Sequence, residues 1–259
     1  MLRARKYFIV AIAVLGFAAA SCGDHNSSSA ATTAVSGNVT VFAAASLTAA
    51  FTAVGDAFKA ANPDAKVTFN FASSSDLVTQ INEGAAADVY ASADQANMRK
   101  LVDAAGNAGD PQVFARNSLQ IIVQPGNPKS IKTLADLANP DILYVTCAPE
   151  VPIGKYAAQA LATAGVTVTP VSLEENVKGI VTKVTLGEAD AGIVYTTDVI
   201  AAGDHAEGIE IPARDNVIAT YPIVVTKAAP NPAGASAFNA FVVSDQGQKI
   251  LAGYGFTSP

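Results

Sequence analysis

The feature that most constrains the fold of this chain is a regular alternation of short β-prone segments with helical segments. In the β-prone segments apolar side chains form continuous runs or alternate, whereas in the helical segments they recur every three to four residues. The pattern predicts strand, helix, strand, helix and strand, in that order, at residues 39–44, 47–61, 66–71, 77–84 and 88–91. This rhythm is typical of an α/β fold built from βαβ units.

A second series with the same character follows. Strands are expected at residues 117–124, 142–147, 191–195 and 221–226, and helices at residues 154–163, 177–186, 233–241 and 246–254. Two similar α/β units, joined by β-prone segments near 117–124 and 219–226, predict two lobes connected by two crossovers. The end of the chain is expected to return to the first lobe. The sequence contains no tandem repeat of 20–50 residues.

The N-terminus has the pattern of a secretory signal. Arg3, Arg5 and Lys6 precede the uncharged apolar residues 7–20, a stretch shorter than the ~20 residues of a membrane-spanning helix. Small residues then lead into Cys22, as in a lipobox, which predicts a signal peptide at 1–21 and a lipid-modified cysteine. The residues after it are rich in Ser, Thr, Ala and Asn, so we expect 22–37 to be a flexible tether. No other segment is long and apolar enough to span a membrane.

Composition narrows the class of protein. Charged residues make up 15% of the chain and apolar residues 50%, which excludes a disordered chain. The formal charge is −6, and removal of residues 1–21 takes away three basic groups and no acid, which leaves −9. An acidic surface argues against nucleic acid as a partner. If Cys22 is acylated, Cys147 is the only thiol left, and we expect it to be a small buried apolar residue.

The residues needed for common enzyme chemistry are missing. The only histidines are His25, in the expected tether, and His205, in a polar stretch, and neither has a partner at metal-ligand spacing. Gly-x-Ser-x-Gly, Ser-x-x-Lys, Walker A and Gly-x-Gly-x-x-Gly motifs do not occur. Glu174 and Glu175 are adjacent and so face different directions, as on a solvated face. We therefore expect no enzyme activity, no cofactor and no direct metal ligands.

Polar or turn-forming residues stand at four expected helix starts. Ser46 follows the first strand as an N-cap would, residues 73–76 (SSSD) follow the second, and Pro152 and Asn176 open later helices. Each one taken singly is an ordinary cap. Together they could line a cleft with donors only, because helix N-termini present unpaired N–H groups and lie at the carboxyl ends of strands. Tyr195 could complete such a site, which suits a fully deprotonated oxyanion such as sulfate or molybdate.

Several motifs resemble the molybdate-binding proteins of bacterial molybdate ABC importers. They are VFAAASLT at 41–48, FASSS at 71–75, ADVYASAD at 87–94, PEVPIGKYA at 149–157, GEADAGIVY at 187–195 and YGF at 254–256. The similarity runs from about residue 39 to residue 256. It implies the two-lobed periplasmic binding protein fold of type II, with lobe I formed by 38–118 and 225–259 and lobe II by 119–224.

The resemblance also implies roles for five residues. Ser46 and Ser74 would donate hydroxyl and backbone hydrogen bonds from lobe I, Ile153 and Val177 would donate backbone N–H groups from lobe II, and Tyr195 would donate its phenol. The ligand implied is molybdate, with tungstate as a close analogue, bound as an oxyanion without protein atoms on the metal.

The partners implied are an ABC permease with its ATPase subunit, to which a closed form would deliver the anion. The location implied is the extracytoplasmic face of the membrane, where a lipid on Cys22 anchors a monomer. Two alternatives remain open at this point: the same fold binding sulfate, phosphate or a small organic anion, and a structural or sensory lipoprotein with a vestigial cleft.

Overall fold

The computed structural model describes residues 35–259. The expected signal peptide, Cys22 and residues 22–34 of the expected tether lie outside the described residues. The first strand begins at Gly37, the last residue assigned to that tether. None of the described helices is long and apolar enough to cross a membrane.

Lobe I is built on a five-stranded mixed sheet. Its strands are β1 (Gly37–Ala44), β2 (Ala65–Ala72), β3 (Val89–Ala91), β4 (Gln112–Asn117) and β10 (Ala219–Val225), in the spatial order β2-β1-β3-β10-β4. Strand β1 pairs in parallel with β2 and β3, whereas β10 is antiparallel to both β3 and β4. The alternating βαβ pattern of the first hundred residues therefore produces the parallel part of this sheet.

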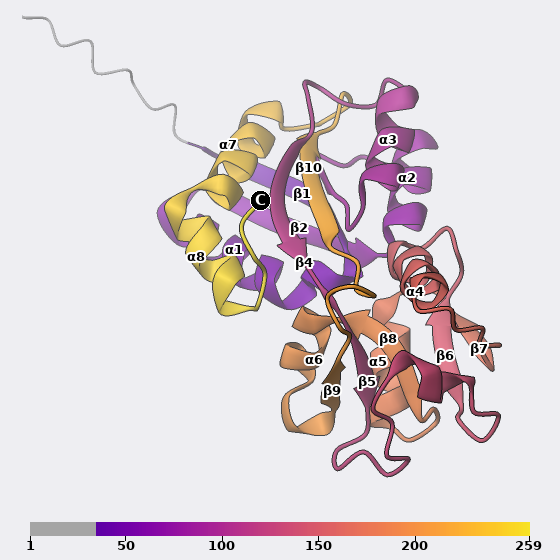
Figure 1. Cartoon of the computed structure of the whole chain (residues 1–259). Coiled ribbons are helices and arrows are strands. Elements are labelled where there is room, and N and C mark those ends of the chain that lie inside the picture. The colour runs from indigo at the N-terminus through magenta and orange to yellow at the C-terminus, as the bar shows by residue number, and fades with distance from the viewer. Residues whose placement is uncertain (1–34) are drawn as a thin grey trace, which may run out of the picture. The chain divides into compact units, whose positions relative to one another are not determined.

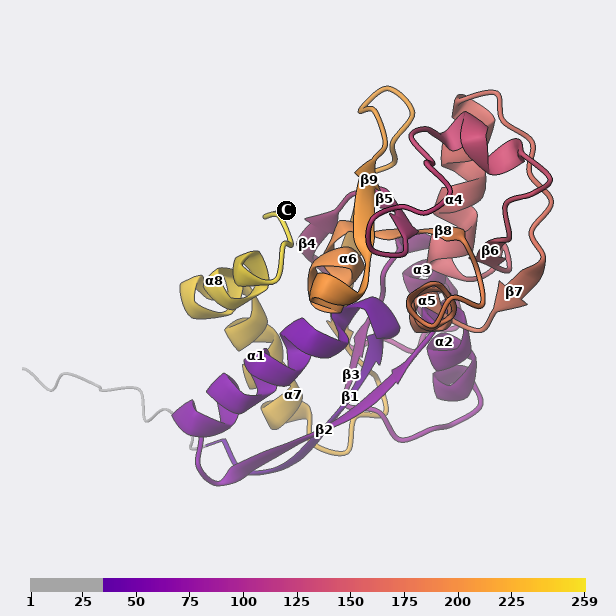
Figure 2. The same ribbon diagram turned by 90° about the horizontal axis from the view of Figure 1, so that it is seen from below.

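Helices cover both faces of the sheet of lobe I (Figures 1 and 2). On one face lie α1 (Thr48–Ala61), α7 (Pro232–Val243) and α8 (Asp245–Gly253), and on the other lie α2 (Ser74–Asn82) and α3 (Gln95–Asp103). Strand β1 is apolar on both sides for this reason. Val39 and Val41 belong to the core shared with Phe51, while Phe42 points to a separate cluster with Leu77.

Lobe II repeats the arrangement with a second five-stranded sheet. Its strands are β5 (Leu119–Val123), β6 (Tyr144–Cys147), β7 (Ser172–Glu174), β8 (Ala191–Tyr195) and β9 (Glu207–Glu210), in the order β7-β6-β8-β5-β9. The helices are α4 (Pro152–Thr163), α5 (Val177–Thr185) and α6 (Thr196–Ala202), with 3₁₀ turns η2 (Leu134–Ala138) and η3 (Gly203–His205). The predicted α/β class with two lobes is confirmed.

The crossovers differ in detail from the expected ones. The strand predicted at 117–124 corresponds to β5, which begins at Leu119, whereas β4, which ends at Asn117, was missed; the lobes change at Ser118. The lobe boundary expected at 224/225 is wrong, because the orange strand β10 lies in the sheet of lobe I (Figure 1). The second crossover is therefore formed by residues 211–218. Pairing of β10 between β3 and β4 decides this, and no local sequence signal reports it.

Candidate functional site

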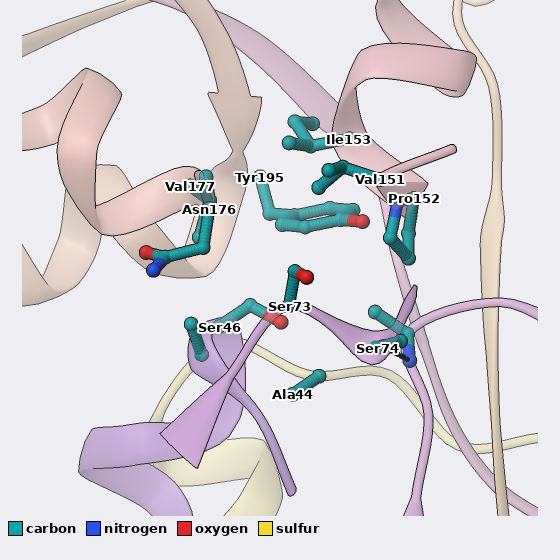
Figure 3. Close-up of a pocket in the computed structure, with 12 residues that line it drawn as sticks. Ala44, Ser46, Ser73, Ser74, Val151, Pro152, Ile153, Asn176, Val177 and Tyr195 are labelled. Atoms are coloured by element: carbon teal, nitrogen blue, oxygen red, sulfur yellow. Dashed lines mark hydrogen bonds between the residues drawn. The ribbon is translucent and has the colours of Figure 1, made fainter. Parts of the chain in front are cut away.

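Four helical N-termini meet at one small cavity between the lobes (Figure 3). From lobe I come the 3₁₀ turn η1 (Ala45–Leu47), which follows β1, and helix α2, which follows β2. From lobe II come α4, after β6, and α5, after β7. The cavity is lined by Ala44, Ala45, Ser46, Ser73, Ser74, Ala93, Val151, Pro152, Ile153, Asn176, Val177 and Tyr195.

All five residues predicted to contact the ligand line this cavity. Ser46 and Ser74 stand on one side, Ile153 and Val177 on the other, and the phenol ring of Tyr195 extends between them (Figure 3). The cavity has a volume of about 20 Å³. A single water needs ~10–15 Å³ by the same measure, so the cavity suits a compact ion and excludes a sugar, peptide or nucleotide.

The caps of the four helix starts are of two kinds. At α2 the Ser73 hydroxyl accepts from the Asp76 N–H at 3.2 Å, and at α5 the Asn176 side chain accepts from the Lys178 N–H at 2.9 Å. The starts of η1 and α4 follow Ala44 and Val151, which provide no side-chain cap. The expectation that Ser46 caps a helix is wrong, because Ser46 lies inside η1.

The backbone donors come from the first turns of α4 and α5. Val177 is the first residue of α5, and Ile153 is the second residue of α4, after Pro152. The N–H groups of a first turn have no acceptor within the helix, so both are available to a ligand. The first turn of α4 can pack against the end of β6 only because residue 154 is glycine. A Cβ there would lie 2.3 Å from the carbonyl oxygens of Cys147 and Ala148.

The Ser74 hydroxyl is constrained to donate. Its oxygen accepts a 3.0 Å hydrogen bond from the Ala93 N–H, a group that can only donate. Ser74 is 1% exposed, and its hydroxyl proton is left for whatever occupies the cavity. Ser46 contacts a different partner, since its Oγ lies 3.0 Å from the phenol oxygen of Tyr221 on β10.

Tyr195 brings an unpaired phenol into the cavity. The residue is 1% exposed, and its hydroxyl is buried without a hydrogen-bond partner. Its ring packs edge-on against Tyr156 and Tyr221, with centroid distances of 6.5 and 5.8 Å. Burial, followed by these two phenols, raises the pKa of Tyr195 well above its ordinary value. The hydroxyl therefore stays protonated and can donate.

Within the described part of the chain, no charged side chain lines the cavity. Asp198 is buried behind it in lobe II, where it accepts from the Tyr195 N–H at 3.3 Å and pairs with the Lys178 ammonium at 2.8 Å. Burial raises the pKa of Asp198, and Lys178 opposes that rise. Asp76, on the first turn of α2, is exposed, as expected for an acid that stabilises the helix dipole from the solvent side.

Three contacts join the lobes beside the cavity, all between the start of α3 and the start of α4. The Lys155 ammonium lies 4.0 Å from the Asp94 carboxylate, and the Asn97 amide donates to the Glu150 carbonyl at 3.3 Å. The Tyr156 hydroxyl donates to the Ala93 carbonyl at 3.5 Å. The lobes are therefore in contact along one edge of the cavity.

Sequence reasoning missed several participants. Tyr221 and Asp198 come from segments distant in the chain, and nothing in their local sequence marks them. Ala93 lies in the motif at 87–94, but the motif does not reveal that its N–H donates to Ser74. Ser73 had a signal, because it begins the SSSD run, but only the structure separates its capping role from the free hydroxyl of Ser74. Cys147 is buried, as expected, and burial raises the pKa of its thiol to about 12. Among residues 35–259 no group of His, Cys, Asp or Glu side chains is placed to hold a metal ion.

Two α/β lobes around a small cavity lined by donors define a solute-binding protein. Residues 39–257 match the bacterial extracellular solute-binding proteins, and the chain belongs to that family. It is a family of binding proteins and not of enzymes. The chain is 40% identical over 251 residues to the molybdate-binding protein ModA of Mycobacterium tuberculosis H37Rv. The alignment covers 97% of this chain and 96% of that protein.

Two solved structures share the fold. The periplasmic molybdate-binding protein of Azotobacter vinelandii superposes with a TM-score of 0.74 at 21% identity, covering 85% of this chain and 99% of that one. The sulfate-binding protein SubI of M. tuberculosis gives a TM-score of 0.78 at 22% identity, covering 85% and 86%. Since proteins named for two different anions match equally well, the fold alone does not select the ligand.

Proposed function

We propose that this protein captures molybdate between its lobes and delivers it to an ABC permease. The observation that carries the proposal is the cavity, in which the hydroxyls of Ser74 and Tyr195 are free to donate and no charged side chain is present. The five contacts would be the hydroxyls of Ser46, Ser74 and Tyr195 and the N–H groups of Ile153 and Val177.

The chemistry of the donors supports a fully deprotonated tetrahedral oxyanion. Each ligand oxygen would accept from a hydroxyl or from a helix N-terminus, where the backbone carries partial positive charge. Hydrogen phosphate fits less well, because its P–OH group needs an acceptor. No lysine or arginine lines the cavity, so fixed dipoles and not ion pairs would hold the anion.

The relatives support molybdate as the particular anion. The ModA protein of M. tuberculosis is similar along nearly the whole chain, and that of Escherichia coli K12 is 34% identical over 231 residues. Tungstate has the same charge and shape as molybdate, so we expect it to compete. The similarity to SubI keeps sulfate as the second candidate ligand. Molybdate is larger than sulfate, so a cavity that fits molybdate would hold sulfate less closely, and cavity size would discriminate between the two anions.

The proposal extends to the setting of the protein. The lobes would close about Ser118 and residues 211–218, and closure is favoured only by contacts that the open form lacks. The protein would act as a monomer without a cofactor at the extracytoplasmic face of the membrane, held there by a lipid on Cys22.

Thermal unfolding of the purified protein with molybdate, tungstate, sulfate or phosphate tests the assignment. A ligand at ~100 times its Kd adds about 2.7 kcal/mol to the stability, a rise in Tm of roughly 5–10 °C. We expect this rise with molybdate and tungstate. At the same ligand concentration the rise should be smaller in Ser46→Ala and Ser74→Ala but not in Ser236→Ala, which removes an exposed hydroxyl on α7. A rise with sulfate alone would refute molybdate specificity, and none with any oxyanion would favour a structural or sensory role.

A further inference from the structure

Tyr221 lies beside the Ser46 hydroxyl at the cavity. Its side chain is fully buried on β10 of the lobe I sheet, and its hydroxyl lies 3.0 Å from Ser46 Oγ. Burial raises the pKa of the Tyr221 phenol above its ordinary value, so the phenol keeps its proton. Among the described residues Ser46 Oγ is the hydrogen-bond partner of this phenol, and a buried O–H group without an acceptor would be costly.

We propose that Tyr221 is a positioning residue that commits the Ser46 hydroxyl to donate into the anion cavity. The buried Tyr221 proton has Ser46 Oγ as its acceptor, so the Ser46 proton is left to point at the ligand. Ser74 is committed in the same way by the Ala93 N–H. The inference rests on the proposed function and adds to it a residue that sets the selectivity of the site without touching the ligand.

This arrangement has a consequence for selectivity. Without the Tyr221 proton, the Ser46 hydroxyl can turn and present a lone pair to the cavity. A deprotonated anion then loses one donor, whereas hydrogen phosphate gains the acceptor that its P–OH group needs. Removal of the Tyr221 hydroxyl should therefore weaken molybdate binding and strengthen phosphate binding relative to it.

The test is isothermal titration of molybdate and of phosphate into Tyr221→Phe. The variant keeps the ring, which packs against Phe256, Tyr195 and Phe114 with centroid distances of 5.3, 5.8 and 6.2 Å. We expect about tenfold weaker molybdate binding, the usual scale for one hydrogen bond in a buried site, and a lower molybdate-to-phosphate affinity ratio. Tyr144→Phe is the matched control, because it removes a buried phenol hydroxyl from β6, outside the cavity.

A double-mutant cycle separates positioning from a general structural effect. In a Ser46→Ala background the Tyr221 hydroxyl has no serine to orient, so Tyr221→Phe should cause no further loss of molybdate affinity. An equal loss in both backgrounds, or an unchanged affinity ratio in the single variant, would overturn the role of Tyr221. If the unmodified protein does not bind molybdate, the proposed function fails instead, which keeps the two failures distinct.

Discussion

Tyr195→Phe should separate binding from stability, because the hydroxyl that it removes has no hydrogen-bond partner among residues 35–259. Tyr195 is 1% exposed and its oxygen is buried and unpaired. A buried polar group without a partner costs ~1–3 kcal/mol of stability. The ligand-free variant should therefore unfold at an unchanged or higher free energy, since the ring contacts with Tyr156 and Tyr221 remain.

Molybdate binding should change in the opposite direction. A hydrogen bond to a charged acceptor is worth ~1.5–3 kcal/mol, which corresponds to a loss of roughly 10- to 150-fold in affinity at about 1.4 kcal/mol per factor of ten. Calorimetric titration measures the affinity, and urea unfolding of the ligand-free protein measures the stability.

Two results would refute this reasoning. Unchanged molybdate affinity would mean that the phenol does not contact the anion. A loss of more than about 1 kcal/mol in the ligand-free variant would mean that the hydroxyl has a structural partner. Tyr144→Phe again provides the comparison, since its hydroxyl is also buried without a partner, but on β6 away from the cavity.

Three further predictions concern the same site and its supports. Gly154→Ala should lower stability by ~1–3 kcal/mol and weaken molybdate binding, because the added Cβ would collide with two carbonyl oxygens and displace the start of α4. Titration measures the affinity and urea unfolding measures the stability. Gly253→Ala is the control for both measurements, because an added Cβ there would meet open space. Molybdate affinity should stay constant from about pH 7 to about pH 10, because burial raises the pKa of Tyr195 and the donor is lost only above that raised value. In a Cys22→Ser background, Cys147 should resist a thiol reagent at about pH 8 until the protein is unfolded, because its pKa of about 12 leaves roughly one thiol in ten thousand ionised.

Each of these has a contradicting outcome. Equal effects of the two glycine variants would show that the Gly154 contact is relieved without moving α4. An inflection in affinity near pH 10 that Tyr195→Phe abolishes would show an ordinary phenol pKa. Rapid modification of the native Cys22→Ser protein would show that the environment of Cys147 opens to solvent.

The sequence predicted the local elements well where one short segment carries the whole signal. The run SSSD gives the Ser73 cap of α2, and Asn176 caps α5, because capping needs only a side chain and an N–H two or three residues away. The short strands β7 and β9 were missed, since β7 has just three residues and both are edge strands of the lobe II sheet without a continuous apolar run.

The sequence predicted five residues that line the cavity, but not the contacts that orient their hydroxyls. Ser46, Ser74, Ile153, Val177 and Tyr195 do line one cavity, and their identification came from motif resemblance and helix starts. The sequence assigned Ser46 to a cap, whereas its hydroxyl partner is Tyr221, 175 residues away. No local pattern can report a contact between strands that become neighbours only when the sheet forms.

The sequence by itself determined that this chain is an α/β protein with helix N-termini at the ends of its strands, because periodicity and capping are properties of neighbouring residues. The class of binding protein came from the resemblance of its motifs to a known family. The tertiary structure decided which lobe receives β10 and which hydroxyls are free to donate. Those outcomes depend on strand pairing and on burial, which join segments distant in sequence. The direction of a hydroxyl proton follows from the partner that the fold places beside it.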